Sequence, residues 1–175
     1  MNKDLEMKLV RNYPIIFSQY GGDKRQTCMS WGMSCGNGWY NLINNLCEDV
    51  TTTIGNKNIK IIAAQVKEKF GGLRFYYDID APDTFVSKID YIVSNAMFKI
   101  RLGKLYWRIQ DFRKKFYRTT LEKIEDIISN AEHKSYKICE ICGEPGKTRG
   151  QGWVTTQCKK CWDKTLNKRS CGLVV

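Results

Sequence analysis

Two C-x-x-C pairs, Cys139 with Cys142 and Cys158 with Cys161, are the residues of this chain best suited to chemistry. The fifteen residues between the pairs match the spacing of four-thiolate zinc sites, in which a hairpin brings two tight turns together. Four sulfur ligands complete the tetrahedral coordination of zinc and leave no position for a substrate. The pattern therefore predicts one zinc ion with a structural role, bound by these four thiolates.

The residues around the two pairs favour a zinc ribbon. Gly143 directly follows the first pair and can take the left-handed conformation needed where the chain turns past a metal. The segment 153–156 has the composition of a strand and should lead into the second pair. We expect this metal hairpin to end near Asp163 and the tail 167–175 to be loosely held.

The remaining cysteines are not expected to form a second site. The spacings of Cys28, Cys35 and Cys47 match no common ligand pattern. A second metal site or a redox pair would be the alternative, but small thiols more often fill a core. Cys171 lies in the predicted tail and is expected to have no role.

No arrangement of residues predicts catalysis. His133 is the single histidine, so any Cys–His or Ser–His pair would have to use it, and we expect it to be exposed at a helix end. The chain has no Walker or Rossmann glycine pattern. The acidic residues are scattered along it, so we expect a protein that is not an enzyme.

Composition predicts a globular protein. The chain has 175 residues, of which 42% are hydrophobic and 12% aromatic, enough for one core with a small appended module. The start of the chain does not resemble a signal peptide, and no apolar run reaches membrane-spanning length. We therefore expect a soluble, cytoplasmic protein without a membrane partner, whose eight cysteines serve as thiols and metal ligands rather than disulfides.

The positive charge is concentrated in one predicted helix. The formal net charge is +11, and eight basic residues face one acid, Asp111, between Lys99 and Arg118. Such a face is often only solvated, and basic residues beside the cysteines also offset the negative charge of a four-thiolate centre. Cations with interleaved rings can, however, bind phosphates and bases. The partner-binding residues predicted on this helix and on the metal hairpin are Arg101, Lys104, Trp107, Arg108, Lys115, Arg118, Arg149, Lys159 and Lys160.

The N-terminal half predicts helices that pack on a sheet. Residues 3–11 favour a short helix, which stops before Pro14. Residues 28–39 have the composition of a short strand or extended segment that leads into a helix over 39–50. At helical spacing, the side chains that this helix should bury are Trp39, Leu42, Ile43 and Leu46.

A hairpin follows in the sequence. The segments 66–70 and 73–77 alternate apolar and polar residues around Gly71 and Gly72, two glycines that can supply the positive φ angles of a primed turn. A further helix should begin near Asp83.

We therefore expect an α+β protein: a small antiparallel sheet with helices, a long basic helix and a C-terminal zinc ribbon. The predicted boundaries are an α+β domain over 1–97, the long basic helix over 98–134, and the zinc-ribbon module with its tail over 135–175.

Three strings of the sequence are distinctive: RQTCMSWG at 25–32, GNGW at 36–39 and VKEKFGGLRFY at 66–76. Together they resemble a family of small uncharacterised proteins encoded by bacteriophages and prophages. The residues 139–146, with Gly-Trp at 152–153, are similar to the zinc-binding module of the same family. The resemblance implies a bacterial host cell as the setting but no activity, and it carries over only the four cysteines as functional residues.

The leading hypothesis is a phage-type zinc-binding accessory protein that binds nucleic acid or a nucleoprotein through its basic surface. The alternative is a protein-directed inhibitor of a host defence complex, such as an anti-CRISPR, that occupies the nucleic-acid or partner site of its target. Neither the target nor the oligomeric state follows from the sequence.

Overall fold

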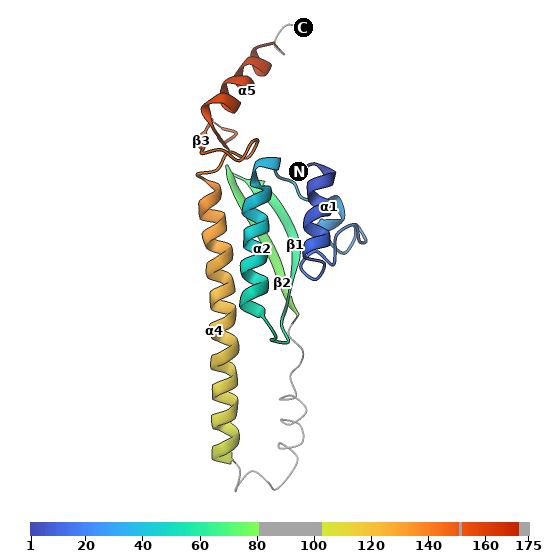
Figure 1. The fold of residues 1–175 in the computed structure, drawn as a ribbon, viewed down its shortest axis with the longest axis vertical. Coiled ribbons are helices and arrows are strands. Elements are labelled where there is room, and N and C mark those ends of the chain that lie inside the picture. Colours follow the sequence, from blue (N-terminus) through green and yellow to red (C-terminus); the bar gives the residue numbers. More distant parts are fainter. Residues whose placement is uncertain (81–102, 151, 172–175) are drawn as a thin grey trace.

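The protein has an α+β fold, described here by a computed structural model for residues 1–80, 103–150 and 152–171, with the backbone alone for 103–118 and 168–171. The helices and strands are α1 (Lys3–Asn12), α2 (Tyr40–Ile54), β1 (Lys60–Lys69), β2 (Gly72–Asp80), α4 (Gly103–Ser135), β3 (Lys147–Arg149), β4 (Thr155–Gln157) and α5 (Lys159–Cys171). Helix α2 lies against the β1–β2 hairpin, with α1 on one side and α4 on the other (Figure 1). The helix expected near Asp83 lies outside the described residues.

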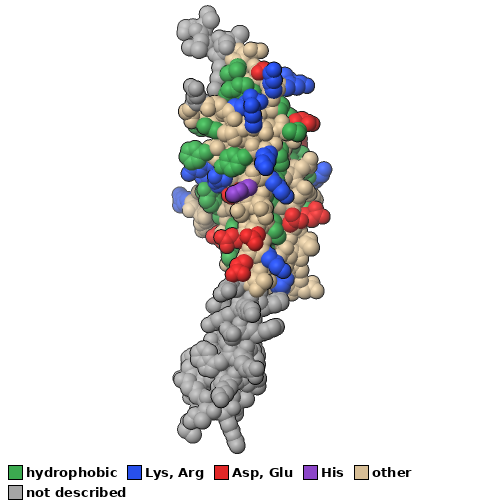
Figure 2. All heavy atoms as spheres, turned by 90° about the vertical axis from the view of Figure 1, so that its left-hand side faces the viewer, with side chains coloured by type: hydrophobic (Ala, Val, Ile, Leu, Met, Phe, Trp, Pro, Cys, Tyr) green, Lys and Arg blue, Asp and Glu red, His purple; other side chains and the backbone are tan. Residues whose placement is uncertain are grey.

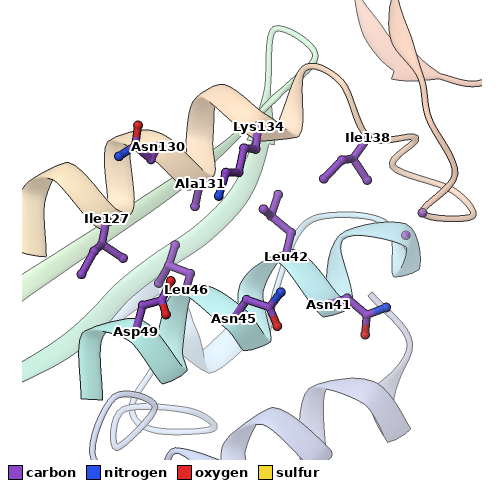
Figure 3. Close-up of a pocket in the computed structure, with 12 residues that line it drawn as sticks. Asn41, Leu42, Asn45, Leu46, Asp49, Ile127, Asn130, Ala131, Lys134 and Ile138 are labelled. Carbon is purple, nitrogen blue, oxygen red and sulfur yellow. The ribbon is translucent and has the colours of Figure 1, made fainter. Parts of the chain in front are cut away.

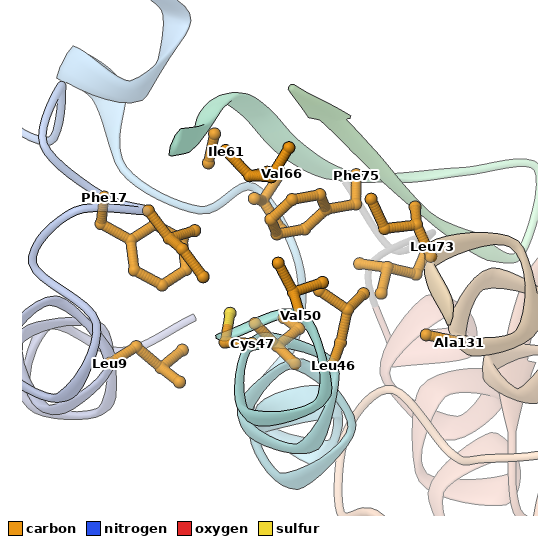
Figure 4. Close-up of a cluster of buried hydrophobic side chains, with 14 of the residues drawn as sticks. Leu9, Phe17, Leu46, Cys47, Val50, Ile61, Val66, Leu73, Phe75 and Ala131 are labelled. Atoms are coloured by element: carbon orange, nitrogen blue, oxygen red, sulfur yellow. The ribbon is translucent and has the colours of Figure 1, made fainter. Parts of the chain in front are cut away.

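One hydrophobic core joins α1, α2, the hairpin and α4 (Figure 4). From α2, Leu46 and Val50 point toward Phe75 of β2, while Leu9 of α1 and Ala131 of α4 close the two sides. The prediction for the side chains around α2 is confirmed, because all four are buried: Trp39, Leu42, Ile43 and Leu46.

The β1–β2 hairpin is centred on the predicted turn, but its strands extend beyond the predicted 66–70 and 73–77 and the turn conformation differs. The strands pair antiparallel up to Lys69 opposite Gly72, and the residues with positive φ are Phe70 (54°) and Gly71 (79°). The expectation that Gly72 supplies the second positive φ is therefore wrong. Gly72 is needed for space, because a Cβ there would lie 2.4 Å from the ring of Tyr136.

Both edges of this two-stranded sheet are covered, which protects strands that would otherwise offer free hydrogen-bonding groups. On the β2 edge, the amide of Leu73 donates to Ser135 Oγ (2.8 Å) and the amide of Phe75 donates to Glu132 Oε1 (2.9 Å). On the β1 edge, Ser34 exchanges backbone hydrogen bonds with the strand at Val66 O (2.9 Å) and Glu68 N (2.8 Å). The C-terminal end of α4 is thus held against the hairpin by polar groups as well as by the core.

Residues 28–39 are not extended as predicted. They form two short 3-10 helices, Cys28–Trp31 and Asn37–Trp39, and only Ser34 between them bridges to β1. The side chain of Thr27 accepts a hydrogen bond from the amide of Met29 and caps the first of these helices. Local capping therefore outweighs the strand-like composition of this segment.

A buried carboxylate fixes α1 to the same segment. Glu6 is 5% exposed; its Oε1 accepts a hydrogen bond from the amide of Met33 (2.9 Å), and its Oε2 accepts one from the Tyr20 hydroxyl. A Cβ at Gly32 would lie 2.6 Å from this carboxylate. Glu6 therefore sets the path of the chain just before residues 36–39.

Helix α4 is 33 residues long, and its described side chains are not basic overall. From Thr119 to Ser135 the acids Glu122, Glu125, Asp126 and Glu132 outnumber Lys123 and Lys134. The prediction places the helix over 98–134 with its basic part from Lys99 to Arg118; residues 98–102 lie outside the described residues, and the backbone alone is described over 103–118. The ends of two helices differ from the predictions. Helix α2 continues beyond residue 50 to Ile54, and α5 extends into the predicted tail as far as Cys171.

Among the described helices, none combines the length and apolar character needed to cross a membrane.

We predict that Ser135→Ala lowers the free energy of unfolding by about 1–3 kcal/mol, because the buried amide of Leu73 loses its acceptor. Urea unfolding followed by tryptophan fluorescence measures the change. Ser18 is exposed, so Ser18→Ala is the matched control and should change the stability by less than about 0.5 kcal/mol. Equal effects of the two substitutions would contradict the role assigned to Ser135.

Candidate metal centre

The structure brings the four predicted cysteines together. Their sulfur atoms all lie within 4.8 Å of one another, and Cys142 Sγ is 3.7 Å from Cys158 Sγ. A tetrahedral thiolate centre with metal–sulfur bonds of about 2.3 Å has sulfurs about 3.8 Å apart. The cluster is therefore compatible with a metal site that protein ligands fill completely. It is the one such group found within the described part of the chain.

The two pairs reach the site from different local structures. In the first pair the chain turns back on itself, with the amide of Gly143 donating to Cys139 O (2.8 Å) and with Gly143 at φ 83°, as its position predicted. The second pair lies at the start of α5, where the amide of Cys161 donates to Cys158 Sγ (3.4 Å). A helix N-terminus favours the negative charge of a thiolate. The order of elements is therefore a tight turn, the β3–β4 hairpin and a helix, here named the four-cysteine module (residues 138–171).

The thiols of the module differ in proton affinity. Burial alone would raise the pKa of the Cys139 thiol, but hydrogen bonds from the backbone amides of Cys158, Cys142 and Ile141 lower it to about 7. Burial and the adjacent thiols raise the pKa of Cys161 to about 12. A metal ion that binds here must displace protons, so its binding releases protons to solvent.

The first cysteine turn is docked on residues 36–39, an arrangement that sequence reasoning missed. The amide of Gly36 donates to Glu140 Oε1 (2.9 Å), the amide of Gly38 donates to Glu140 O (2.7 Å), and Trp39 Nε1 donates to Ile138 O (2.9 Å). A Cβ at Gly36 would lie 2.2 Å from Glu140 O, and one at Gly38 would lie 2.1 Å from Cys139 O. Both glycines are therefore required by close approach of two backbones. The signal in the sequence was the pair of glycines directly before a buried tryptophan.

The β1–β2 hairpin holds the other side of the module. Thr156 of β4 is fully buried, and its hydroxyl donates to Gly71 O (2.6 Å). A Cβ at Gly71 would lie 3.3 Å from the side chains of both Val154 and Thr156. The turn 70–71 therefore packs on the β3–β4 hairpin, and the module is fixed at two separate points of the N-terminal half.

The predicted partner-binding residues are only partly described. Arg149, in β3, is half-buried and its Nε donates to Gln157 O (3.0 Å), so it braces the β3–β4 hairpin. Lys159 and Lys160 are exposed in the first turn of α5. Arg101 lies outside the described residues. The backbone alone is described for Lys104, Trp107, Arg108, Lys115 and Arg118, which belong to α4.

The other cysteines and the histidine lie away from this site. Cys35 and Cys47 are buried in the core as predicted, and burial raises the pKa of Cys35 to about 12. Cys28 is exposed, so its predicted role as a core residue is wrong. His133 is exposed near the end of α4, as predicted.

A groove with both polar and apolar lining lies between α2 and α4, beside the module (Figure 3). Its volume is about 320 Å³, and it is lined by three amides from Asn41, Asn45 and Asn130, together with Asp49 and Lys134. These groups can donate and accept hydrogen bonds, but they include no nucleophile beside a general base.

Comparisons of the chain with protein-family models, with curated proteins and with solved structures found no match. The resemblance to phage-encoded proteins therefore stays a prediction.

We predict that Cys142→Ser removes the bound metal, because three thiolates bind far more weakly than four. Metal analysis of the purified protein should show about one ion per chain for the wild type and a small fraction of that for the variant. Cys28→Ser is the matched control, since this exposed thiol lies outside the cluster. Full metal content in Cys142→Ser would argue against the site.

We predict that Gly38→Ala displaces the first cysteine turn, lowers the free energy of unfolding by about 1–3 kcal/mol or more, and weakens metal retention. Competition with a chelator measures the retention. Gly21 also has a positive φ (71°), but a Cβ there would meet no atom within 4 Å. Gly21→Ala should therefore cost only about 1 kcal/mol and keep the metal. Identical metal retention in both variants would be inconsistent with the docking of the turn on residues 36–39.

Proposed function

We propose that the protein is a non-enzymatic, phage-type accessory protein that binds one structural zinc ion and contacts nucleic acid or a nucleoprotein through a basic surface. Zinc is the proposed metal because four thiolates in a tetrahedral arrangement suit zinc or iron. Zinc fits a purely structural role, since it has no redox chemistry. Metal analysis distinguishes the two elements directly.

The observation that carries the nucleic-acid proposal is the exposed charge of the four-cysteine module. Four lysines of the module are exposed, against two exposed acids, Glu144 and Asp163. The lysines are Lys147, Lys159, Lys160 and Lys164. In the described part of the chain, no carboxylate lies within ion-pair distance of any of them. The hydrogen bonds that dock the module use its backbone, Glu140 and Thr156, so these lysines are left for a partner.

The module also explains why some of this charge is present. Four thiolates around a divalent ion carry surplus negative charge, and Lys159 and Lys160 lie between Cys158 and Cys161 at the start of α5. Two cations at a helix N-terminus are unfavourable in themselves, and the metal centre offsets that cost. Residues 104–118 of α4 supply further basic groups in the sequence, which extends the proposed surface beyond the module.

Inhibition of a host defence complex is the second proposal. An acidic groove on a protein would attract the same cations as a nucleic acid, since electrostatic complementarity does not distinguish them. Such an inhibitor should co-purify with one host protein even after nuclease treatment, whereas a nucleic-acid-binding protein should lose its partners.

We predict that binding to a labelled oligonucleotide weakens steeply as salt rises, because each lysine or arginine that neutralises a phosphate releases counterions. The double variant Lys159→Gln/Lys160→Gln should flatten the slope of log K against log salt by about 0.7–0.9 for each phosphate that is no longer neutralised. If α4 also contacts phosphates, the double variant Lys104→Gln/Arg108→Gln should flatten the slope by a similar amount.

Lys8 and Lys24 are exposed residues of the N-terminal region, and the control Lys8→Gln/Lys24→Gln should leave the slope unchanged. If neither single strands nor duplexes bind at about 50 mM salt, the nucleic-acid proposal fails.

A further inference from the structure

The turn of the β1–β2 hairpin holds an aromatic ring in solvent at a cost in backbone energy. Phe70 has a φ of 54° and is 70% exposed. A bulky residue with positive φ is a conformational outlier, whereas asparagine or glycine takes this position readily. Phe70 gains little from burial in return. Conformational outliers of this kind concentrate at functional sites, so we expect the exposed ring to have a function.

A second exposed ring lies on the adjoining turn. Trp153 is 71% exposed and follows Gly152 (φ 83°) between β3 and β4. A Cβ built on Gly71 would lie 3.3 Å from the Val154 side chain, so these two residues lie close together where the two hairpins meet. Each of them is the direct neighbour in sequence of one of the rings. The docking of the module therefore brings two solvent-exposed aromatic residues to the same junction.

Cations accompany the rings. The ammonium of Lys69 lies 5.4 Å from the centre of the Phe70 ring, and that of Lys67 lies 5.2 Å from the centre of the Tyr76 ring. Lys67 pairs with Arg74 and Lys69 with Gly72. Because side chains alternate between the two faces of a sheet, Lys67, Lys69 and Tyr76 lie on its outward face. Phe70 lies in the turn.

Two acids of the hairpin and of α4 are engaged by other groups. Glu132 Oε2 lies 3.6 Å from an Arg74 nitrogen, and Glu68 Oε1 accepts a hydrogen bond from the amide of Gly71 (2.6 Å). On the face shown in Figure 2, lysine and arginine side chains lie among hydrophobic ones above the histidine, together with some acidic side chains, and further acidic side chains lie below it. The cations placed against the rings are Lys69, beside Phe70, and Lys67, beside Tyr76.

We propose that this ring-and-cation surface (Lys67, Lys69, Phe70, Tyr76 and Trp153) binds single-stranded nucleic acid by stacking bases on Phe70 and Trp153. Stacking on aromatic side chains combined with cations for the phosphates is how such strands are bound without sequence preference. The bases of a duplex are already stacked on one another and cannot reach both rings. The inference rests on the proposed nucleic-acid function and names the form of nucleic acid that is bound.

The experiment measures fluorescence anisotropy of a labelled thymidine oligonucleotide of about 20 nucleotides, and of a duplex of equal length, with the metal-loaded full chain. Phe70→Asn removes the ring and suits the left-handed position, so this variant should unfold at a higher urea concentration than the wild type while binding the single strand about 5- to 100-fold more weakly. Trp153→Ala should weaken binding to a similar extent. A purely structural role for Phe70 would not combine higher stability with weaker binding.

Trp31 is the matched control, because it is 70% exposed and has its own cation, Lys24, at 4.5 Å, but lies outside this surface. Trp31→Ala should bind as the wild type does. Wild-type affinity in both Phe70→Asn and Trp153→Ala, or a preference for the duplex, would overturn the inference while leaving the broader nucleic-acid function intact.

Two further outcomes also overturn it. The first uses polyglutamate, which carries negative charge but no bases, as a competitor. If it displaces the labelled strand as effectively as unlabelled oligonucleotide does, and equally from the wild type and the ring variants, the surface binds acidic chains by charge alone. If no nucleic acid binds in any form, both this inference and the proposed nucleic-acid function fail together.

Discussion

The close approach of the first cysteine turn to residues 36–39 joins the four-cysteine module to the N-terminal half of the protein. Two backbones meet there with no room for a side chain at Gly36 or Gly38, and hydrogen bonds to Glu140 and Ile138 complete the junction. The same turn holds Cys139 and Cys142. The position of the four-cysteine cluster is therefore coupled to the position of residues 36–39, because a shift of either backbone would break these hydrogen bonds.

The hairpin and α4 extend this constraint across the molecule. Ser135 and Glu132 accept hydrogen bonds from one edge of β2, and Thr156 fixes the hairpin turn to the module. The core formed by α1, α2, the hairpin and α4 reaches these same elements. A metal that stabilises the module would therefore also stabilise the position of the hairpin turn. Loss of the metal would then change any binding surface at that turn.

The arrangement also explains why a protein of this size would carry a closed metal centre. The β3–β4 hairpin has two strands of three residues each, too little to bury a core of its own. The hydrogen bonds that dock the module replace part of that missing core, and a metal bound by the four cysteines would add coordination bonds to them. The module exposes lysine side chains and the ring of Trp153 to solvent, and the proposed recognition of an anionic partner rests on these groups.

The clustering of the four cysteines, the position of the hairpin turn and the buried side chains of α2 could be predicted from the sequence, because each depends on spacing within a short segment. So could the conformation of Gly143, which follows from its place after Cys142. The tertiary structure decided why Gly36, Gly38 and Gly72 are glycines, since the atoms that exclude a side chain there come from segments about 64–104 residues away in the chain. It also decided that Phe70, rather than Gly72, takes the strained position of the turn, because Gly72 is committed to its close approach to Tyr136.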